Sequence, residues 1–184
     1  MRRFTTAAAL SVALVAGLVS TSSPAAAAPE TASRTVEDTV VRQGTIPGAE
    51  LLAQAERDGT PYSAKKARAL KKAPCRWFER QQGLRVVKSN GKKGRWLIWV
   101  KLRLNWCYDG YQVLSANAKY RSYTYDRATY RWRGWGQKHL KRTGSSVTSR
   151  VKGKFYHTRS GRTYKPWITS KGYSDGAYRW WSNI

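Results

Sequence analysis

Residues 95–107 read RWLIWVKLRLNWC, and their alternation is the clearest structural signal in the chain. Every second residue from Trp96 to Trp106 is apolar, whereas the positions between them include Lys101 and Arg103. Side chains of a β-strand point alternately to its two faces, so this pattern places a hydrophobic core on one side and cations on the other. We therefore predict a half-buried antiparallel strand here.

Six further segments have β-strand character, and turn-forming pairs separate several of them. The turn pairs are Asn90-Gly91, Asp109-Gly110, Ser160-Gly161 and Asp175-Gly176. The segments are 84–88, 111–125 (with a break near residue 117), 129–135, 146–158, 163–171 and 177–182. Seven or eight short strands predict an all-β fold, an antiparallel β-sandwich, with a small β-barrel as the alternative.

The residues before these strands differ in character. Residues 1–28 read as a signal peptide, because a positive start precedes an apolar run of about ten residues and a stretch of alanines. Residues 29–46 are polar and lack periodicity, which predicts a disordered arm. Residues 47–74 form a helical segment, with one helix expected over 47–59 and a second over 64–73. The basic, Trp-rich β domain then covers residues 75–184.

Cys75 and Cys107 are the only cysteines in the chain. In a secreted protein, two cysteines predict one disulfide. The bond would close a loop of 31 residues. In the chain-entropy model, that closure stabilises a fold by about 3–4 kcal/mol.

The run Trp106-Cys107-Tyr108-Asp109-Gly110, within a Trp-rich β region behind an alanine-rich export signal, resembles small secreted proteins of actinomycete bacteria. The resemblance covers residues 75–184 and implies secretion and an all-β fold. It implies no activity and no catalytic residue.

The charge is far from neutral: 35 Lys and Arg stand against 10 Asp and Glu, a formal net charge of +25. Solubility of a small domain needs a net charge of only about 2–8, so a polyanionic partner is the expected reason for the excess. We expect one basic aromatic face made by the outward residues of three strands. Its residues are Arg95, Trp99, Lys101, Arg103, Arg131, Arg133, Trp135, Arg150, Lys152, Lys154 and Tyr156.

Catalytic chemistry has little support in the sequence. The four carboxylates of residues 75–184 are Glu79, Asp109, Asp126 and Asp175. The three aspartates lie in predicted turns, where their side chains bond locally, and Glu79 is expected to pair with a neighbouring arginine. No catalytic residue, metal site or cofactor is predicted, because neither a nucleophile motif nor metal-ligand spacing is present.

The expected function is therefore that of a secreted, non-enzymatic protein that binds a polyanion. Teichoic acid, nucleic acid, an acidic glycan and an anionic lipid surface all fit such a face. One alternative is a secreted nuclease, a toxin-like ribonuclease that uses His139 or His157 as an acid–base group. Others are a carbohydrate-binding envelope module, whose exposed tryptophans stack on sugars, and a membrane-active protein.

Overall fold

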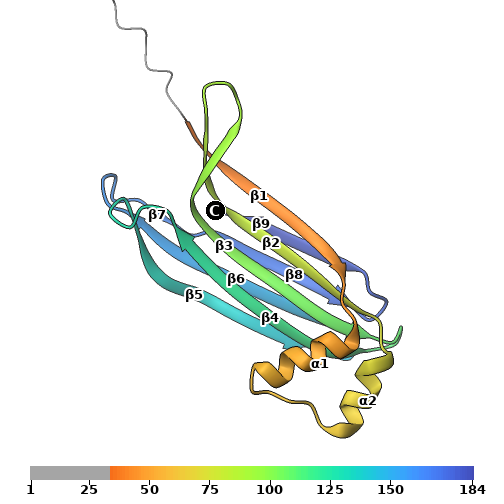
Figure 1. Ribbon diagram of the computed structural model, residues 1–184. Helices are drawn as coiled ribbons and strands as arrows, with labels where there is room; N and C mark the ends of the chain where they lie inside the picture. The colour runs from red at the N-terminus through yellow and green to blue at the C-terminus, as the bar shows by residue number, and fades with distance from the viewer. Residues whose placement is uncertain (1–33) are drawn as a thin grey trace, which may run out of the picture. The chain divides into compact units, whose positions relative to one another are not determined.

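The computed structural model describes residues 34–184. The signal peptide predicted at residues 1–28, and the first residues of the predicted arm, lie outside them. The described chain is an all-β sandwich with two short helices, as the sequence predicts (Figure 1).

Sheet A has four antiparallel strands, which are neighbours in the same order as in the chain. They are β1 (Arg34–Thr45), β2 (Cys75–Val87), β3 (Lys93–Tyr108) and β4 (Val113–Thr124).

Sheet B has the order β5-β6-β8-β9, and a two-residue strand, β7, also pairs with β6. Its strands are β5 (Tyr130–Arg142), β6 (Ser146–His157), β7 (Thr163–Tyr164), β8 (Trp167–Tyr173) and β9 (Tyr178–Asn183).

The core lies between the two sheets. Ile98 and Val100 of β3 share one hydrophobic cluster with Val151 and Phe155 of β6, and all four side chains have no exposed surface. The alternation predicted for residues 95–107 and 146–158 is therefore confirmed, with the apolar side of each strand facing the other sheet.

The two helices dock on the outward side of sheet A. Helix α1 (Gly48–Arg57) and helix α2 (Ala64–Lys72) agree closely with the predicted helices. Buried Leu51 and Leu70 pack with the Cys75–Cys107 disulfide, whose formation confirms the predicted bond. Since both cysteines lie at the same end of sheet A, the helices cover that end (Figure 1).

The predicted disordered arm is wrong for residues 34–45, which form β1. This strand pairs with β2 along its whole length, from Arg34 opposite Val87 to Thr45 opposite Arg76. An edge strand has a partner on one side only, and polar residues on it are common because they discourage pairing with other molecules. The polar composition that suggested disorder is thus the composition of an edge strand.

Other strand bounds also differ from the prediction. Strand β2 starts at Cys75, nine residues before the predicted segment 84–88. The prediction missed its first part because Arg80 and Gln82 face inward and hide the alternation. Strand β4 has no break, and its Asn117 pairs with Asn105 of β3. Strand β5 continues to Arg142, seven residues beyond the end of the segment predicted at 129–135. The predicted segment 163–171 divides into β7 and β8, so the described chain has nine strands.

Candidate functional site

The single basic face predicted from three strands is wrong, because these strands belong to different sheets. Strand β3 lies in sheet A, whereas β5 and β6 are neighbours in sheet B. The apolar sides of β3 and β6 meet in one core, so their outward sides face away from each other. The predicted cations are therefore divided between two surfaces on opposite sides of the sandwich.

Trp135 does not lie on the outward side beside Arg133, as the alternation predicted. Between Trp132 and Trp135, β5 advances three residues while β6 advances two. The extra residue forms a bulge at Gly134, whose φ of 92° is accessible to glycine. A bulge reverses the alternation, so the ring of Trp135 turns to the core and packs 4.9 Å from that of Trp132.

The register of sheet B identifies its outward face, because residues paired across antiparallel strands point to the same side. Arg150 pairs with His139 on one neighbouring strand and with Thr169 on the other, and Thr169 pairs with Trp181. We call this side of the sheet the outer face of sheet B. Its cations are Arg131, Arg133, Lys141, Arg150, Lys152, Lys154, Lys171 and Arg179, and its large rings are Tyr156, Trp167, Tyr173 and Trp181.

Several of these cations lie over the rings. The guanidinium of Arg150 is 5.4 Å from the ring centre of Trp167, and Lys171 lies 4.9 Å from that of Tyr173. Such contacts contribute about 0.5–1 kcal/mol at exposed sites and limit the positions that a long side chain can adopt. Trp181 keeps 46% of its surface exposed. The outer face of sheet B thus combines ordered cations with accessible aromatic surface.

Sequence reasoning missed part of this face. Trp167 and Lys171 are four residues apart and share one side of β8. Arg179 and Trp181 are two residues apart and share one side of β9. Both segments were predicted as strands, so the same period-two rule could have assigned these side chains to one side. Lys141 was missed because it lies beyond residue 135, where the predicted strand ends.

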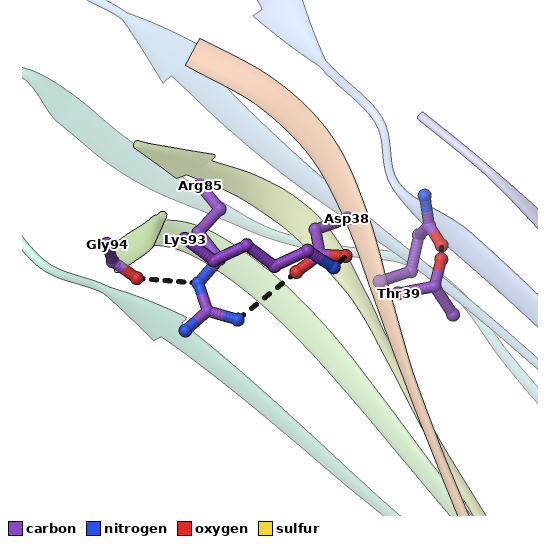
Figure 2. A network of polar contacts seen from close by, with 6 residues as sticks. Asp38, Thr39, Arg85, Lys93 and Gly94 are labelled. Atoms are coloured by element: carbon purple, nitrogen blue, oxygen red, sulfur yellow. Dashed lines mark hydrogen bonds and ion pairs between the residues drawn. The ribbon is translucent and has the colours of Figure 1, made fainter. Parts of the chain in front are cut away.

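In sheet A, by contrast, several cations pair with carboxylates, as Figure 2 shows for Asp38. This buried carboxylate accepts hydrogen bonds from Lys93 at 2.6 Å and from Arg85 at 3.2 Å. Arg85 also donates to the carbonyl oxygen of Gly94. Burial raises the pKa of Asp38, but the hydrogen bonds from Lys93 and Arg85 outweigh it and hold the pKa below its ordinary value. The network joins β1 to β2 and β3.

The predicted cations of β3 lie on the outward side of sheet A. Lys101 pairs with Glu79 at 3.3 Å, whereas the sequence suggested an arginine neighbour for this glutamate. The guanidinium of Arg103 lies 4.3 Å from the ring centre of Trp77. Both cations line a groove of about 270 Å³ against α1. Glu50 of that helix lines the same groove. These side chains are largely occupied by partners within the fold.

The two sheets therefore differ in their ion pairs. All four ion pairs among residues 34–184 use a cation of sheet A: Arg85, Lys93, Lys101 and Lys119. The strands of sheet B contain ten Lys and Arg and neither Asp nor Glu. The positive charge of sheet B consequently has no carboxylate partner within the described part of the chain.

Arg80 is a buried cation between the sheets. It is 4% exposed, donates to the hydroxyl of Ser182 at 2.6 Å and lies 3.2 Å from the ring centre of Trp180. Desolvation lowers its pKa to about 10. Because both partners belong to β9, Arg80 links sheet A to the edge of sheet B and does not reach the outer face.

The two histidines do not form one acid–base site. His139 pairs with Arg150, and His157 lies seven residues further along β6, a separation of about 23 Å for an extended strand. Nδ1 of His157 accepts a hydrogen bond from the backbone N–H of Ser160, which places this ring in the turn after β6. An enzyme that needs both imidazoles at one phosphate is not supported by this geometry.

The aspartates of the β region serve their turns, as predicted. Asp109 accepts from the backbone N–H groups of Tyr111 and Gln112, and these bonds lower its pKa. Asp126 accepts from the Thr129 hydroxyl and the Ala128 N–H, which lowers its pKa in the same way. Carboxylates held by turn hydrogen bonds are poor general acids at neutral pH.

Within the described residues, no group of His, Cys, Asp and Glu side chains could hold a metal ion. Neither helix of that part has the length and apolar character needed to cross a membrane.

Comparison of the chain with protein-family models, curated proteins and solved structures gave no match. The resemblance suggested by residues 106–110 stays a prediction, and any functional conclusion rests on the geometry.

Proposed function

We propose that the protein binds a linear polyanion through the outer face of sheet B. One observation carries this proposal: the strands of sheet B hold ten cations and neither Asp nor Glu, and no ion pair of the described residues involves them. Unpaired like charges repel one another and oppose compaction, so a surface that keeps them is suited to an anion supplied from outside.

The arrangement favours a polymer over a small anion. Arg150, Lys152 and Lys154 are alternate residues of β6, so their side chains leave the strand about every 6.7 Å. Lys171 and Arg179 extend the positive surface sideways onto β8 and β9. A chain of phosphate, sulfate or carboxylate groups can contact such a surface at several points and release a counterion at each.

The proposal includes an extracellular location and no catalytic step. The Cys75–Cys107 disulfide supports the location, because such bonds persist mainly in oxidising compartments. Teichoic acid, an acidic glycan, nucleic acid and an anionic lipid surface are the ligands that this charge pattern would accept.

Retention on phosphocellulose at increasing salt tests the proposal. The Arg150→Glu, Lys152→Glu, Lys154→Glu variant should elute at much lower salt than the wild type. Each lost phosphate contact should reduce the slope of log affinity against log salt by roughly 0.7–0.9.

A matched variant with the same net charge is the control. Arg34, Arg42 and Arg121 are exposed residues of sheet A, and none of them belongs to an ion pair. Their replacement by Glu should leave the slope of the wild type nearly unchanged. Equal losses in the two variants would show that net charge alone causes retention, and salt-independent retention of the wild type would exclude the surface.

A further inference from the structure

A groove of about 680 Å³ opens between the end of β4 and the start of β5, beside the outer face of sheet B. Here the chain passes from sheet A to sheet B through residues 125–129. Three arginines line the groove: Arg127 from the turn, and Arg131 and Arg133 from β5. Two of them also belong to the outer face of sheet B, so the groove continues the proposed binding surface.

Two aromatic residues, together with Ser122 and Thr124, form the remaining walls. Tyr123 of β4 stacks on Trp99, with ring centres 5.4 Å apart and planes 12° apart, and it keeps 40% of its surface exposed. Trp132 of β5 lies on the other side, where its ring packs 4.7 Å from that of Phe155. Trp99 and Phe155 thus support the two rings from behind, which restricts their motion.

The charge in the groove is uniformly positive. Asp126 lies in the adjoining turn but does not line the groove, and its carboxylate already accepts hydrogen bonds from Ala128 and Thr129. The volume is within the range of about 300–1,000 Å³ that is usual for pockets of small organic ligands. The groove could therefore accept a planar group together with the phosphates attached to it.

We infer that this groove is a nucleotide subsite, and that the polyanion bound by the protein is a single-stranded nucleic acid. A base would stack on Tyr123, and the flanking phosphates would contact Arg127, Arg131 and Arg133. This inference rests on the proposed polyanion function and narrows its ligand, because a polymer without rings would use the arginines but not the stacked tyrosine. Duplex DNA holds its bases inside the helix and would leave the ring unused.

The experiment compares two polyanions at one salt concentration, with the full secreted chain. One is a single-stranded DNA of about 20 nucleotides, a length that covers the usual site sizes of such proteins. The other is linear polyphosphate with about the same number of charges. The wild type should bind the DNA more tightly, and Tyr123→Ala should weaken DNA binding roughly 5- to 100-fold while polyphosphate binding changes less than about twofold.

Two further variants isolate the ring. Tyr123→Phe keeps the stacking surface and should bind DNA like the wild type. Tyr111→Ala removes a tyrosine that is 91% exposed in the turn between β3 and β4, and it should have no effect. Circular dichroism should confirm that all variants are folded.

The outcomes separate the two proposals. If polyphosphate binds as tightly as DNA and Tyr123→Ala changes neither affinity, the nucleotide subsite is wrong while the polyanion surface stands. Tighter binding to vesicles of anionic lipid than to DNA would also overturn the subsite. If none of these polyanions binds in a salt-dependent way, the proposed function itself fails.

Discussion

Sheet A and sheet B carry similar numbers of cations in their strands, eleven and ten, but only sheet A also carries carboxylates. In sheet A, Asp38 and Glu79 pair with cations of other strands of the sheet, and the helices and the disulfide cover one end. In sheet B, Arg133, Arg150 and Lys171 lie over aromatic rings, and no outward cation belongs to an ion pair of the described residues. The same residue type therefore stabilises the fold in one sheet and is left available in the other.

The disulfide provides the strongest test of this division of roles. Replacing Cys75 and Cys107 by Ala should lower the free energy of unfolding by about 3–4 kcal/mol, because the unfolded chain loses a constraint. Urea denaturation measures this loss. At temperatures where the variant is folded, its retention on phosphocellulose should equal that of the wild type. A folded variant with weakened retention would show that binding is not confined to sheet B.

Gly153 tests the contact between the two sheets. A Cβ at this position would lie 2.6 Å from Val100, which has no exposed surface, and 2.9 Å from the partly buried ring of Trp132. Gly153→Ala should therefore cost about 1–3 kcal/mol of stability through overpacking. The control is Gly144→Ala, where a Cβ would meet nothing within 4 Å. Equal unfolding free energies of the two variants would contradict the close approach of the sheets.

Asp38 tests the role of ion pairs in sheet A. Asp38→Asn should lower the stability by roughly 1–3 kcal/mol near pH 7, because Lys93 and Arg85 lose a charged acceptor. The folded-state pKa of Asp38 lies below the ordinary value of 3.8, so its contribution is complete well above pH 4 and disappears as the pH falls through the folded-state pKa.

Urea titrations between pH 7 and pH 2 measure this dependence. The difference in unfolding free energy between the wild type and Asp38→Asn should shrink as the solution becomes more acidic. A difference that stays constant across this range would mean that the carboxylate charge does not stabilise β1.

The smallest expected effect has opposite signs in the two sheets. Lys152→Glu places an anion between Arg150 and Lys154 of the outer face of sheet B and should raise the stability by about 0.2–1 kcal/mol. Lys101→Glu places an anion against Glu79 and should lower it by a similar amount. Thermal denaturation at low salt compares the two, and both effects should diminish at high salt. The same sign for both substitutions would contradict the comparison of the sheets.

Much of the fold is predictable because its strands follow simple alternation. Ile98 and Val100 in β3, and Val151 and Phe155 in β6, occupy the inward positions expected from a period of two. The exceptions have physical reasons. Arg80 takes an inward position in β2, where its guanidinium stacks on Trp180 of the other sheet. A local pattern cannot reveal a compensation supplied by a residue 100 positions away.

The candidate site was less predictable than the fold. Arg150, Lys152 and Lys154 lie together on an outward face, as expected, but Trp135 turns inward at the bulge of Gly134. The groove between β4 and β5 has no sequence signal of its own. Its position depends on the chain leaving sheet A after Thr124, and the turn that follows resembles those of ordinary hairpins.

The sequence by itself determined the local features: the alternation of β3 and β6, the two helices, the turn aspartates and the cysteine pair. Each of these depends on neighbouring residues or on the only possible partner. The tertiary structure decided which strands share a sheet, and therefore that Lys101 and Arg150 face opposite directions. Strand pairing uses backbone N–H and C=O groups that every residue other than proline carries. The side chains of one strand therefore do not specify which strand will pair with it.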